Sequence, residues 1–259
     1  MEIYVFIFIV SAKNEVSGCD RRTTLTNYLK EYGNTHSSQL NIAIIDSDEI
    51  AHTIYLPGSP CYNKVKKFFE TYKDLHTGEH VNIFSEDGMI IDRPKLSAAV
   101  FKDPKVRKMI NEATHLEIFK EIMKRIFIEF LKSLFVTPRT TTICFVELPL
   151  LFETKIFQYI VSTIVCIKTT PERQLQWLMA RNHYTEEEAQ QRISSQLPVE
   201  EKARRSNFVI DNSRDRDYLK IQTFEMVEYC AKNTTTFGLK TFVAFMVLIL
   251  VLVLVAMIL

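Results

Sequence analysis

The chain has 259 residues, of which 47% are hydrophobic and 24% are charged, and its net charge is +1. This length and composition predict one globular domain of generous size plus a further segment. A charge so close to zero provides no field that would concentrate nucleic acid, so nucleic-acid binding is disfavoured. The five cysteines form no C-x-x-C pair, which is typical of reduced thiols in a cytosol-like compartment. The six histidines are scattered, so no metal site is predicted from them.

Five short apolar runs predict five β-strands. Their hydrophobicity is continuous rather than alternating, which is typical of parallel strands covered by helices on both faces. The first run resembles the apolar part of a signal peptide, but it lacks a basic leader, so a strand is favoured. The runs are residues 3–10, 42–45, 143–146, 160–167 and 208–210.

The segments between these runs predict helices. Pro171 suits a first helical turn, and Thr185 with Glu188 forms a capping box at the start of the last predicted helix. We expect one α/β domain over residues 1–235, with a helical substrate-binding insertion at about 61–135 and a lid at about 172–198. The predicted helices cover residues 23–32, 61–72, 93–101, 105–134, 172–182 and 185–197.

The end of the chain predicts a transmembrane helix. Residues 242–259 are apolar without a break, and at about 1.5 Å per residue they span about 27 Å, close to the hydrocarbon thickness of a bilayer. A buried core helix is the alternative, but it rarely lacks every polar residue over such a length. We expect a tail anchor with the globular domain facing the cytosol, because Lys232 and Lys240 precede the helix. The mitochondrial outer membrane and the endoplasmic reticulum both stay open as the location.

Polar residues follow several of the predicted strands. Asp46 and Asp48 come after the second run, Glu147 after the third and Asn212 after the fifth. In an open parallel sheet the ligand lies beyond the carboxyl ends of the strands, so these residues are candidates for a site. A single acid at such a position can equally serve as a helix cap or turn former. Their convergence at one edge favours a site.

Several motifs occur in an order that points to one enzyme family. They are residues 44–51, 57–60, 86–88 with 92–93, 147–153 and 174–212. In these motifs, over about residues 40–213, the chain resembles dephospho-CoA kinases, which phosphorylate the ribose 3′-hydroxyl of dephospho-CoA in the last step of coenzyme A synthesis. The resemblance implies a three-layer P-loop kinase fold, ATP and Mg²⁺ as cofactors, dephospho-CoA as substrate and an adenylyltransferase as a partner that supplies it. The apolar tail resembles that of membrane-attached animal members.

The resemblance also implies catalytic roles. Phosphoryl transfer needs an aligned acceptor oxygen, a group that accepts its proton, and positive charge over the transferring phosphoryl. Asp48 is the candidate for orienting or deprotonating the hydroxyl, and Asp46 is its competitor, with turn stabilisation as its other role. Arg181 and Arg192 resemble lid arginines that approach the phosphates of ATP, because guanidinium offers several fixed donors. A solvated helix face is the alternative for Arg192.

Four further positions complete the candidate site. Arg93, in the Asp-Arg motif, is assigned to substrate binding. His115 falls where the family has a His-Pro pair, but Leu116 replaces the proline, so substrate contact and helix packing both stay open. Glu147 stands where many relatives have Asp, and an acid there suits a magnesium-bound water. Asn212 is expected near the adenine.

The phosphate loop departs from the family pattern. A G-x-x-x-x-G-K-[ST] loop, which holds phosphates with backbone amides and a lysine, is expected near residues 11–22. Only Ser17 and Gly18 match as ATP-binding residues, while Cys19 and Asp20 replace the Lys and Ser. Without the lysine, transition-state stabilisation is weaker, unless a nearby basic residue substitutes, the candidates being Lys13, Arg21 and Arg22.

Three interpretations therefore compete. The first is a dephospho-CoA kinase whose phosphate loop is altered or incompletely recorded. The second is a membrane-anchored pseudokinase that binds a CoA-like nucleotide or a partner protein without transferring phosphate. The third, an unrelated nucleoside or small-molecule kinase, is disfavoured by the matches at residues 57–60 and 147–153. Retention of the acidic motif and the lid arginines favours the first.

Overall fold

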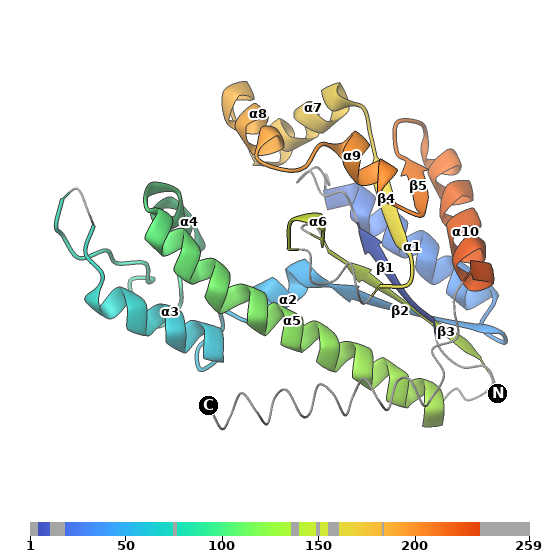
Figure 1. The fold of residues 1–259 in the computed structure, drawn as a ribbon, viewed down its shortest axis with the longest axis horizontal. Coiled ribbons are helices and arrows are strands. Elements are labelled where there is room, and N and C mark those ends of the chain that lie inside the picture. The colour runs from blue at the N-terminus through green and yellow to red at the C-terminus, as the bar shows by residue number, and fades with distance from the viewer. Residues whose placement is uncertain are drawn as a thin grey trace. The chain divides into compact units, whose positions relative to one another are not determined.

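The computed structural model describes residues 5–10, 19–74, 77–135, 140–148, 151–154, 161–182 and 184–233 (Figure 1). The chain divides into two compact units. We call the first, Met1–Ile45 with Ile128–Leu259, the sheet unit, and the second, Asp46–Phe127, the insertion unit.

The sheet unit is built on five strands in the order β2-β3-β1-β4-β5 (Figure 1). β1 pairs in parallel with β3 and β4, and β4 pairs in parallel with β5. Every predicted apolar run overlaps one of these strands, so the predicted α/β class with five strands is confirmed. The strands are β1 (Val5–Val10), β2 (Leu40–Asp46), β3 (Thr141–Glu147), β4 (Ile164–Lys168) and β5 (Phe208–Asp211).

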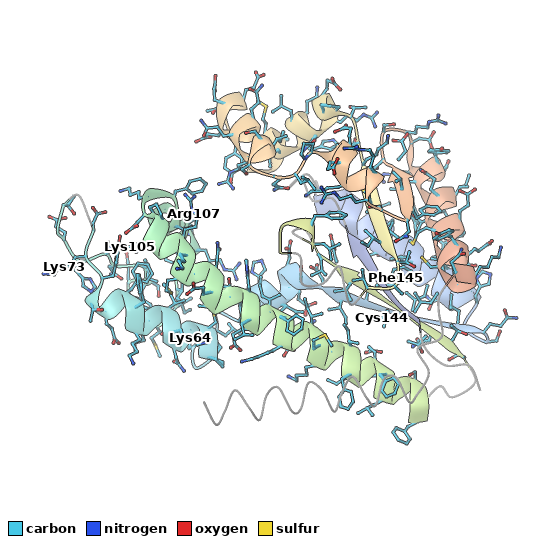
Figure 2. All side chains as sticks on the ribbon, viewed as in Figure 1. Lys64, Lys73, Lys105, Arg107, Cys144 and Phe145 are labelled. Atoms are coloured by element: carbon cyan, nitrogen blue, oxygen red, sulfur yellow. The ribbon has the colours of Figure 1, made fainter. Side chains whose placement is uncertain are left out.

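Helices cover both faces of the sheet. Val165 of β4 packs in the main core cluster with side chains of α1 (Cys19–Thr35) and α10 (Arg216–Asn233), whereas Cys166 packs against Val199 of α9 (Val199–Arg204). Because successive strand residues point to opposite faces, these helices lie on different sides of the sheet. The neighbouring pair Cys144 and Phe145 of β3 is buried in the same way (Figure 2). The unit therefore has three layers.

Helix α10, which the sequence did not predict, lies along the edge strand β5. The Gln222 side chain accepts from Asp211 N at 2.8 Å and donates to Asp211 O at 2.9 Å. Seven residues later, the Tyr229 ring lies 5.3 Å from the Phe208 ring. Since Asp211 ends β5 and Phe208 begins it, α10 runs antiparallel to this strand. An ion pair of 2.6 Å between Lys220 and Glu31 joins α10 to α1.

The segment between β4 and β5 is helical, as predicted. It contains α7 (Pro171–Asn182), α8 (Glu186–Ser194) and α9. The capping box is confirmed, because the Thr185 hydroxyl accepts from Glu188 N while the Glu188 carboxylate accepts from Thr185 N. Helix α8 ends at Ser194 rather than near residue 197, and α9 was not predicted. The short α6 (Leu151–Thr154) follows β3.

The insertion unit contains α2 (Ser47–Thr53), α3 (Pro60–Thr71), α4 (Arg93–Lys102) and most of α5 (Pro104–Phe135). Ser59 caps α3 by accepting from Tyr62 N, and Asp92 caps α4 by accepting from Lys95 N. At the start of α5, Asp103 accepts a 2.5 Å hydrogen bond from the Tyr72 hydroxyl. Because this bond stabilises the charged carboxylate, it is the largest cause that holds the pKa of Asp103 below its ordinary value.

No helix within these described ranges is long and apolar enough to cross a membrane. The predicted transmembrane segment, residues 242–259, lies outside the described residues and stays a prediction. The same holds for Ser17 and Gly18 of the expected phosphate loop.

Candidate active site

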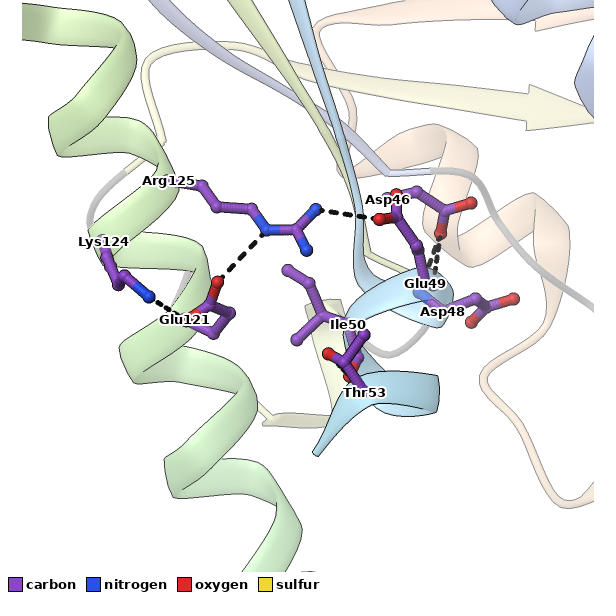
Figure 3. Close-up of polar contacts among 8 residues, drawn as sticks. All are labelled: Asp46, Asp48, Glu49, Ile50, Thr53, Glu121, Lys124 and Arg125. Carbon is purple, nitrogen blue, oxygen red and sulfur yellow. Dashed lines mark hydrogen bonds and ion pairs between the residues drawn. The ribbon is translucent and has the colours of Figure 1, made fainter. Parts of the chain in front are cut away.

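Asp46 is the N-cap of α2. It ends β2 with an extended backbone, φ −94° and ψ 115°, and its Oδ1 accepts from Asp48 N at 2.7 Å and Glu49 N at 3.4 Å (Figure 3). These amides belong to the first turn of the helix, where no carbonyl precedes them to accept a bond. The geometry therefore places Asp46 in the turn-stabilising role that was weighed for it.

Asp48 lies on the first turn of α2 and is half-buried. Asp46 makes the cap, and the backbone N–H of Asp48 is one of the two amides that it caps. The amide dipoles at a helix N-terminus favour a negatively charged side chain there. The role predicted for Asp48, orienting or deprotonating the substrate hydroxyl, stays a prediction.

A basic residue that the sequence did not single out ties α2 to α5. Arg125 lies 3.5 Å from the Glu49 carboxylate and 3.4 Å from the Glu121 carboxylate (Figure 3). The spacing of Glu121 and Arg125 by four residues is a helical pair that a sequence can show. Its partner Glu49 lies more than seventy positions away, so no local pattern indicates that Arg125 fixes the position of the acidic helix.

Arg93 reaches the other end of α2. Its guanidinium donates to Ala51 O at 3.1 Å, lies 3.3 Å from His52 Nε2 and stands over the Tyr55 ring at 5.8 Å. Arg93 is nevertheless exposed, and a guanidinium has five N–H donors. The predicted substrate-binding role remains a prediction, and the contacts show that Arg93 also joins α4 to α2.

A pocket of about 230 Å³ opens between α2, α3 and α5 of the insertion unit. Its charged groups form pairs, with Lys120 at 3.1 Å from Glu117 and Lys124 at 3.2 Å from Glu121. Neither Asp48, Arg93 nor His115 lines the pocket, and His115 is exposed on α5. The structure therefore does not gather these predicted residues there. The lining residues are Thr53, Ile54, Ser59, Pro60, Cys61, Glu117, Lys120, Glu121 and Lys124.

The insertion unit also exposes lysines and arginines, four of which are labelled in Figure 2: Lys64, Lys73, Lys105 and Arg107. Their ammonium and guanidinium groups differ in how they are engaged. Lys64 lies 3.8 Å from Glu117, and Arg107 Nε donates to Val100 O at 3.4 Å. Lys64 is therefore close to a carboxylate, whereas Arg107 is hydrogen-bonded to an uncharged carbonyl and keeps its charge.

At the carboxyl ends of β4 and β5, Asn212 joins the two strands by hydrogen bonds. Its backbone N–H donates to Lys168 O at 2.7 Å, and its carbonyl accepts from the Thr169 hydroxyl at 3.4 Å. Burial raises the pKa of the preceding Asp211, but hydrogen bonds from Ser213 and nearby cations outweigh it and hold that pKa below its ordinary value. Asn212 is therefore a turn residue, and its expected place near an adenine stays a prediction.

The helices α7 and α8 carry the predicted lid arginines. Arg192 is half-buried, and its guanidinium stands 4.4 Å from the centre of the Tyr184 ring, so it does not belong to a fully solvated face. Arg181 is in the last turn of α7, and its side chain lies outside the described residues.

The same helical region buries polar atoms that need partners. Within the described part of the chain, Gln174 Nε2, Gln196 Oε1 and one guanidinium nitrogen of Arg173 are buried without a hydrogen-bond partner. Buried polar groups normally are paired, so such atoms are unusual in a folded protein. Amide and guanidinium groups of this kind can bond a nucleotide, and the predicted role of this region as a lid over ATP stays a prediction.

One carboxylate, that of Glu147, could take part in holding Mg²⁺ beside a bound nucleotide. Within the described residues, no three His, Cys, Asp or Glu side chains cluster as metal ligands. Mg²⁺ beside a nucleotide is held mainly by phosphates and waters with one or two carboxylates. Glu147, the half-buried last residue of β3, provides a single acid of this type. The donor set fits the way Mg²⁺ accompanies nucleotides.

Solved structures define the class of this fold. A crystal structure of a protein from Thermus thermophilus is similar with a TM-score of 0.56 at 21% identity. The match covers 90% of this chain and 97% of the Thermus chain. The structure of a dephospho-CoA kinase from Campylobacter jejuni is similar with a TM-score of 0.57 at 21% identity. That match covers 88% of this chain and 97% of the Campylobacter chain. The fold is the α/β fold of P-loop kinases.

Sequence comparisons then give the family. The family model for dephospho-CoA kinase matches residues 22–217. Dephospho-CoA kinase from Carboxydothermus hydrogenoformans is 40% identical over 175 residues, which is 68% of this chain and 76% of the relative. A dephospho-CoA kinase domain-containing protein from Danio rerio is 33% identical over 196 residues, 76% of this chain and 74% of the relative. The chain belongs to the dephospho-CoA kinase family.

The family match begins after the expected phosphate loop. Ser17, Gly18, Cys19 and Asp20 all precede residue 22, where the match starts. The departure from the glycine-rich pattern therefore lies outside the matched range, and the acidic, insertion and lid motifs lie inside it.

Proposed function

We propose that this protein transfers the γ-phosphoryl group of ATP to the ribose 3′-hydroxyl of dephospho-CoA. The 3′-oxygen attacks the γ-phosphorus, the bond from that phosphorus to the β,γ-bridging oxygen breaks, and ADP leaves. The hydroxyl proton passes to the Asp48 carboxylate. The observation that carries the proposal is the family match over residues 22–217, within which Asp48 stands on the first turn after β2.

Each site residue has a task in this reaction. Asp46 holds the first turn of α2, so that Asp48 meets the hydroxyl at a fixed position. Arg93 and His115 would bind the substrate from the insertion unit. A second group of residues would serve ATP from the sheet unit, namely Arg181, Arg192 and Asn212. Positive charge aimed at the transferring phosphoryl is the main source of acceleration in such reactions.

Mg²⁺ would be held near Glu147 and by the phosphates themselves. When bound, it neutralises charge on the β- and γ-phosphate oxygens. Glu147 ends β3 in register with Ile9 of β1, so the carboxyl group stands at the end of the central strands. Such a place suits a group that orients a metal-bound water through its carboxylate.

A pseudokinase is the second candidate function. The segment from Ser11 to Arg22 has a single glycine and lacks the Gly-Lys-Ser sequence that would surround the phosphates. Such a protein would still bind dephospho-CoA or a CoA-like nucleotide through the insertion unit. It would then act as a binding protein for that nucleotide or for a protein partner.

The apolar residues 242–259 support attachment to a membrane with the kinase domain on the cytosolic side. An adenylyltransferase that produces dephospho-CoA is the expected functional partner, because it makes the substrate of the proposed reaction. The outer mitochondrial membrane and the endoplasmic reticulum are the two proposed locations.

The deciding experiment measures binding and turnover on the same sample of the full chain in detergent micelles. Formation of coenzyme A from dephospho-CoA and ATP is followed by chromatography, and dephospho-CoA binding by calorimetry. Turnover that Asp48→Asn abolishes supports the kinase. Binding without turnover supports the pseudokinase. Phosphorylation of free nucleosides with no activity on dephospho-CoA would refute both and favour a nucleoside kinase.

A further inference from the structure

The last turns of α5 leave an apolar face in water. Ile128, Leu131 and Phe135 are 40%, 36% and 79% exposed, whereas Ile126 and Phe130 are 5% and 4% exposed. At about 100° per residue, the three exposed side chains fall on one side of the helix and the two buried ones on the other. We call Ile128, Leu131 and Phe135 the α5 stripe. All three belong to the sheet unit.

The α5 stripe lies near the end of the sheet where the strands begin. β3 starts at Thr141, and the five residues between it and Phe135 limit their separation to about 22 Å. Thr141 N donates to Gln39 O at 2.9 Å, just before Leu40, so β2 and β3 begin side by side. This amino end of the sheet is opposite to the carboxyl end where ligands bind in such folds.

Helix α10 ends near the amino end of the sheet as well. Its residue Gln222 lies beside Asp211 at the carboxyl end of β5, and Tyr229 lies beside Phe208 at the amino end. Asn233, where α10 ends, is one turn beyond Tyr229. Eight residues separate Asn233 from residue 242, so the chain length limits the distance between these two residues to about 32 Å.

We propose that the α5 stripe rests on the surface of the lipid bilayer that the apolar tail enters. The inference rests on the membrane attachment put forward under the proposed function. Phe135, Leu131 and Ile128 would enter the boundary between headgroups and acyl chains, which accommodates aromatic and aliphatic side chains. The amino end of the sheet then faces the bilayer, and the carboxyl end with Glu147 and Asn212 faces the surrounding water.

Charge and length favour a bilayer over other occupants. Along this face, Lys124 pairs with Glu121 at 3.2 Å and Lys132 pairs with Glu129 at 2.7 Å. The contact therefore needs no anionic lipid. The stripe extends over about 10 Å of helix, whereas the tail helix would be about 27 Å long. A face this short cannot shield the tail from water, so the tail itself is a poor occupant.

The test places a fluorophore in the stripe of the full chain. Phe135→Trp is reconstituted in phosphatidylcholine vesicles whose acyl chains carry bromine, which quenches tryptophan that reaches the acyl region. The matched control is Ile221→Trp on α10 of the same unit, where the native side chain is 55% exposed and the next residue, Gln222, lies at the carboxyl end of β5. The native chain, with Trp177 as its one tryptophan, gives the background. We expect the added emission of Phe135→Trp to fall at least twofold and that of Ile221→Trp to stay unchanged.

Each other outcome overturns the inference in a distinguishable way. If the chain floats with the vesicles but Phe135→Trp is not quenched, the tail alone attaches it. If the chain does not float, membrane attachment fails and the stripe contact with it. Blue-shifted Phe135→Trp emission without vesicles, and no quenching with them, would show that protein covers the stripe. Leu131→Trp gives a second reading within the stripe if Phe135→Trp lowers the thermal midpoint.

Discussion

At the ends of β2 and β5, an aspartate closes the strand and accepts a hydrogen bond from the amide two residues ahead. Asp46 Oδ1 accepts from Asp48 N at 2.7 Å, and Asp211 Oδ1 accepts from Ser213 N at 2.9 Å. The two ends then differ, because α2 begins directly after Asp46 and carries a second acid in its first turn. After Asp211 the chain turns, and no acid stands at the equivalent position. The comparison teaches that the acid ending a strand bonds the backbone at both ends, whereas only the β2 end has a second acid two residues later, and the catalytic role proposed for that acid is what separates the two ends.

The largest effect is expected from Asp48→Asn. If Asp48 accepts the proton, kcat for coenzyme A formation falls about 100-fold or more, while KM changes by less than about threefold. Steady-state kinetics on the full chain measure both constants. The matched control is Asp46→Asn, because Asn caps a helix about as well as Asp does. Equal, mild losses of kcat in both variants would contradict the division of roles.

Asp46→Ala is expected to act on stability. Removing the cap leaves two amides of α2 without their acceptor, which lowers the free energy of unfolding by about 1–2 kcal/mol. Asp46→Asn should lose less than half of that. Urea unfolding followed by circular dichroism measures the difference. Equal stability of the Ala and Asn variants would show that the cap contributes little.

Asp211→Ala tests the other strand end and should leave kcat unchanged. Loss of the hydrogen bond to Ser213 N should lower the free energy of unfolding by about 1 kcal/mol at pH 7. Because the folded protein holds the pKa of Asp211 below its ordinary value, this contribution is present above the unfolded pKa of about 4. It is lost as the pH falls through the lower folded value. Unfolding at pH 7 and pH 3 checks the sign, and a constant difference between variant and native protein would contradict it.

The smallest effect is expected from Ser213→Ala. The Ser213 side chain is one of the groups that lower the pKa of Asp211, so its loss should move that pKa upward, while the backbone bond from Ser213 N remains. Carboxyl titration by NMR measures the shift. A downward movement would show that the hydroxyl does not stabilise the charged carboxylate.

The sequence predicted the sheet well where a strand is covered on both faces, as β3 is. Ile143 to Val146 of β3 are all buried, and this predicted run is uniformly apolar and easy to find. Helix α10 was missed because its buried side includes the polar residues Gln222 and Thr223, which interrupt the apolar period. Helices α2 and α9 have seven and six residues, too few for a period to emerge.

The sequence indicated which residues are candidates for the site, but it could not assign a separate role to each of them. Asp46 and Asp48 are chemically alike and two positions apart, so only the hydrogen bonds separate the cap from the other acid. The contact of Arg125 with Glu49 joins residues distant in sequence, and no local pattern signals it. His115 had a motif position but lies exposed on α5, away from the lined pocket.

The Gln222 side chain at the rim of the sheet has a consequence for how the protein behaves at high concentration. β5 is the last strand in its sheet, so its outer backbone groups are a template for another chain. By accepting from Asp211 N and donating to Asp211 O, one glutamine amide copies the two bonds that a neighbouring strand would make there. A side chain of the same molecule thereby occupies the backbone N–H and C=O of Asp211. A strand from another molecule cannot pair with β5 at this residue unless it displaces Gln222.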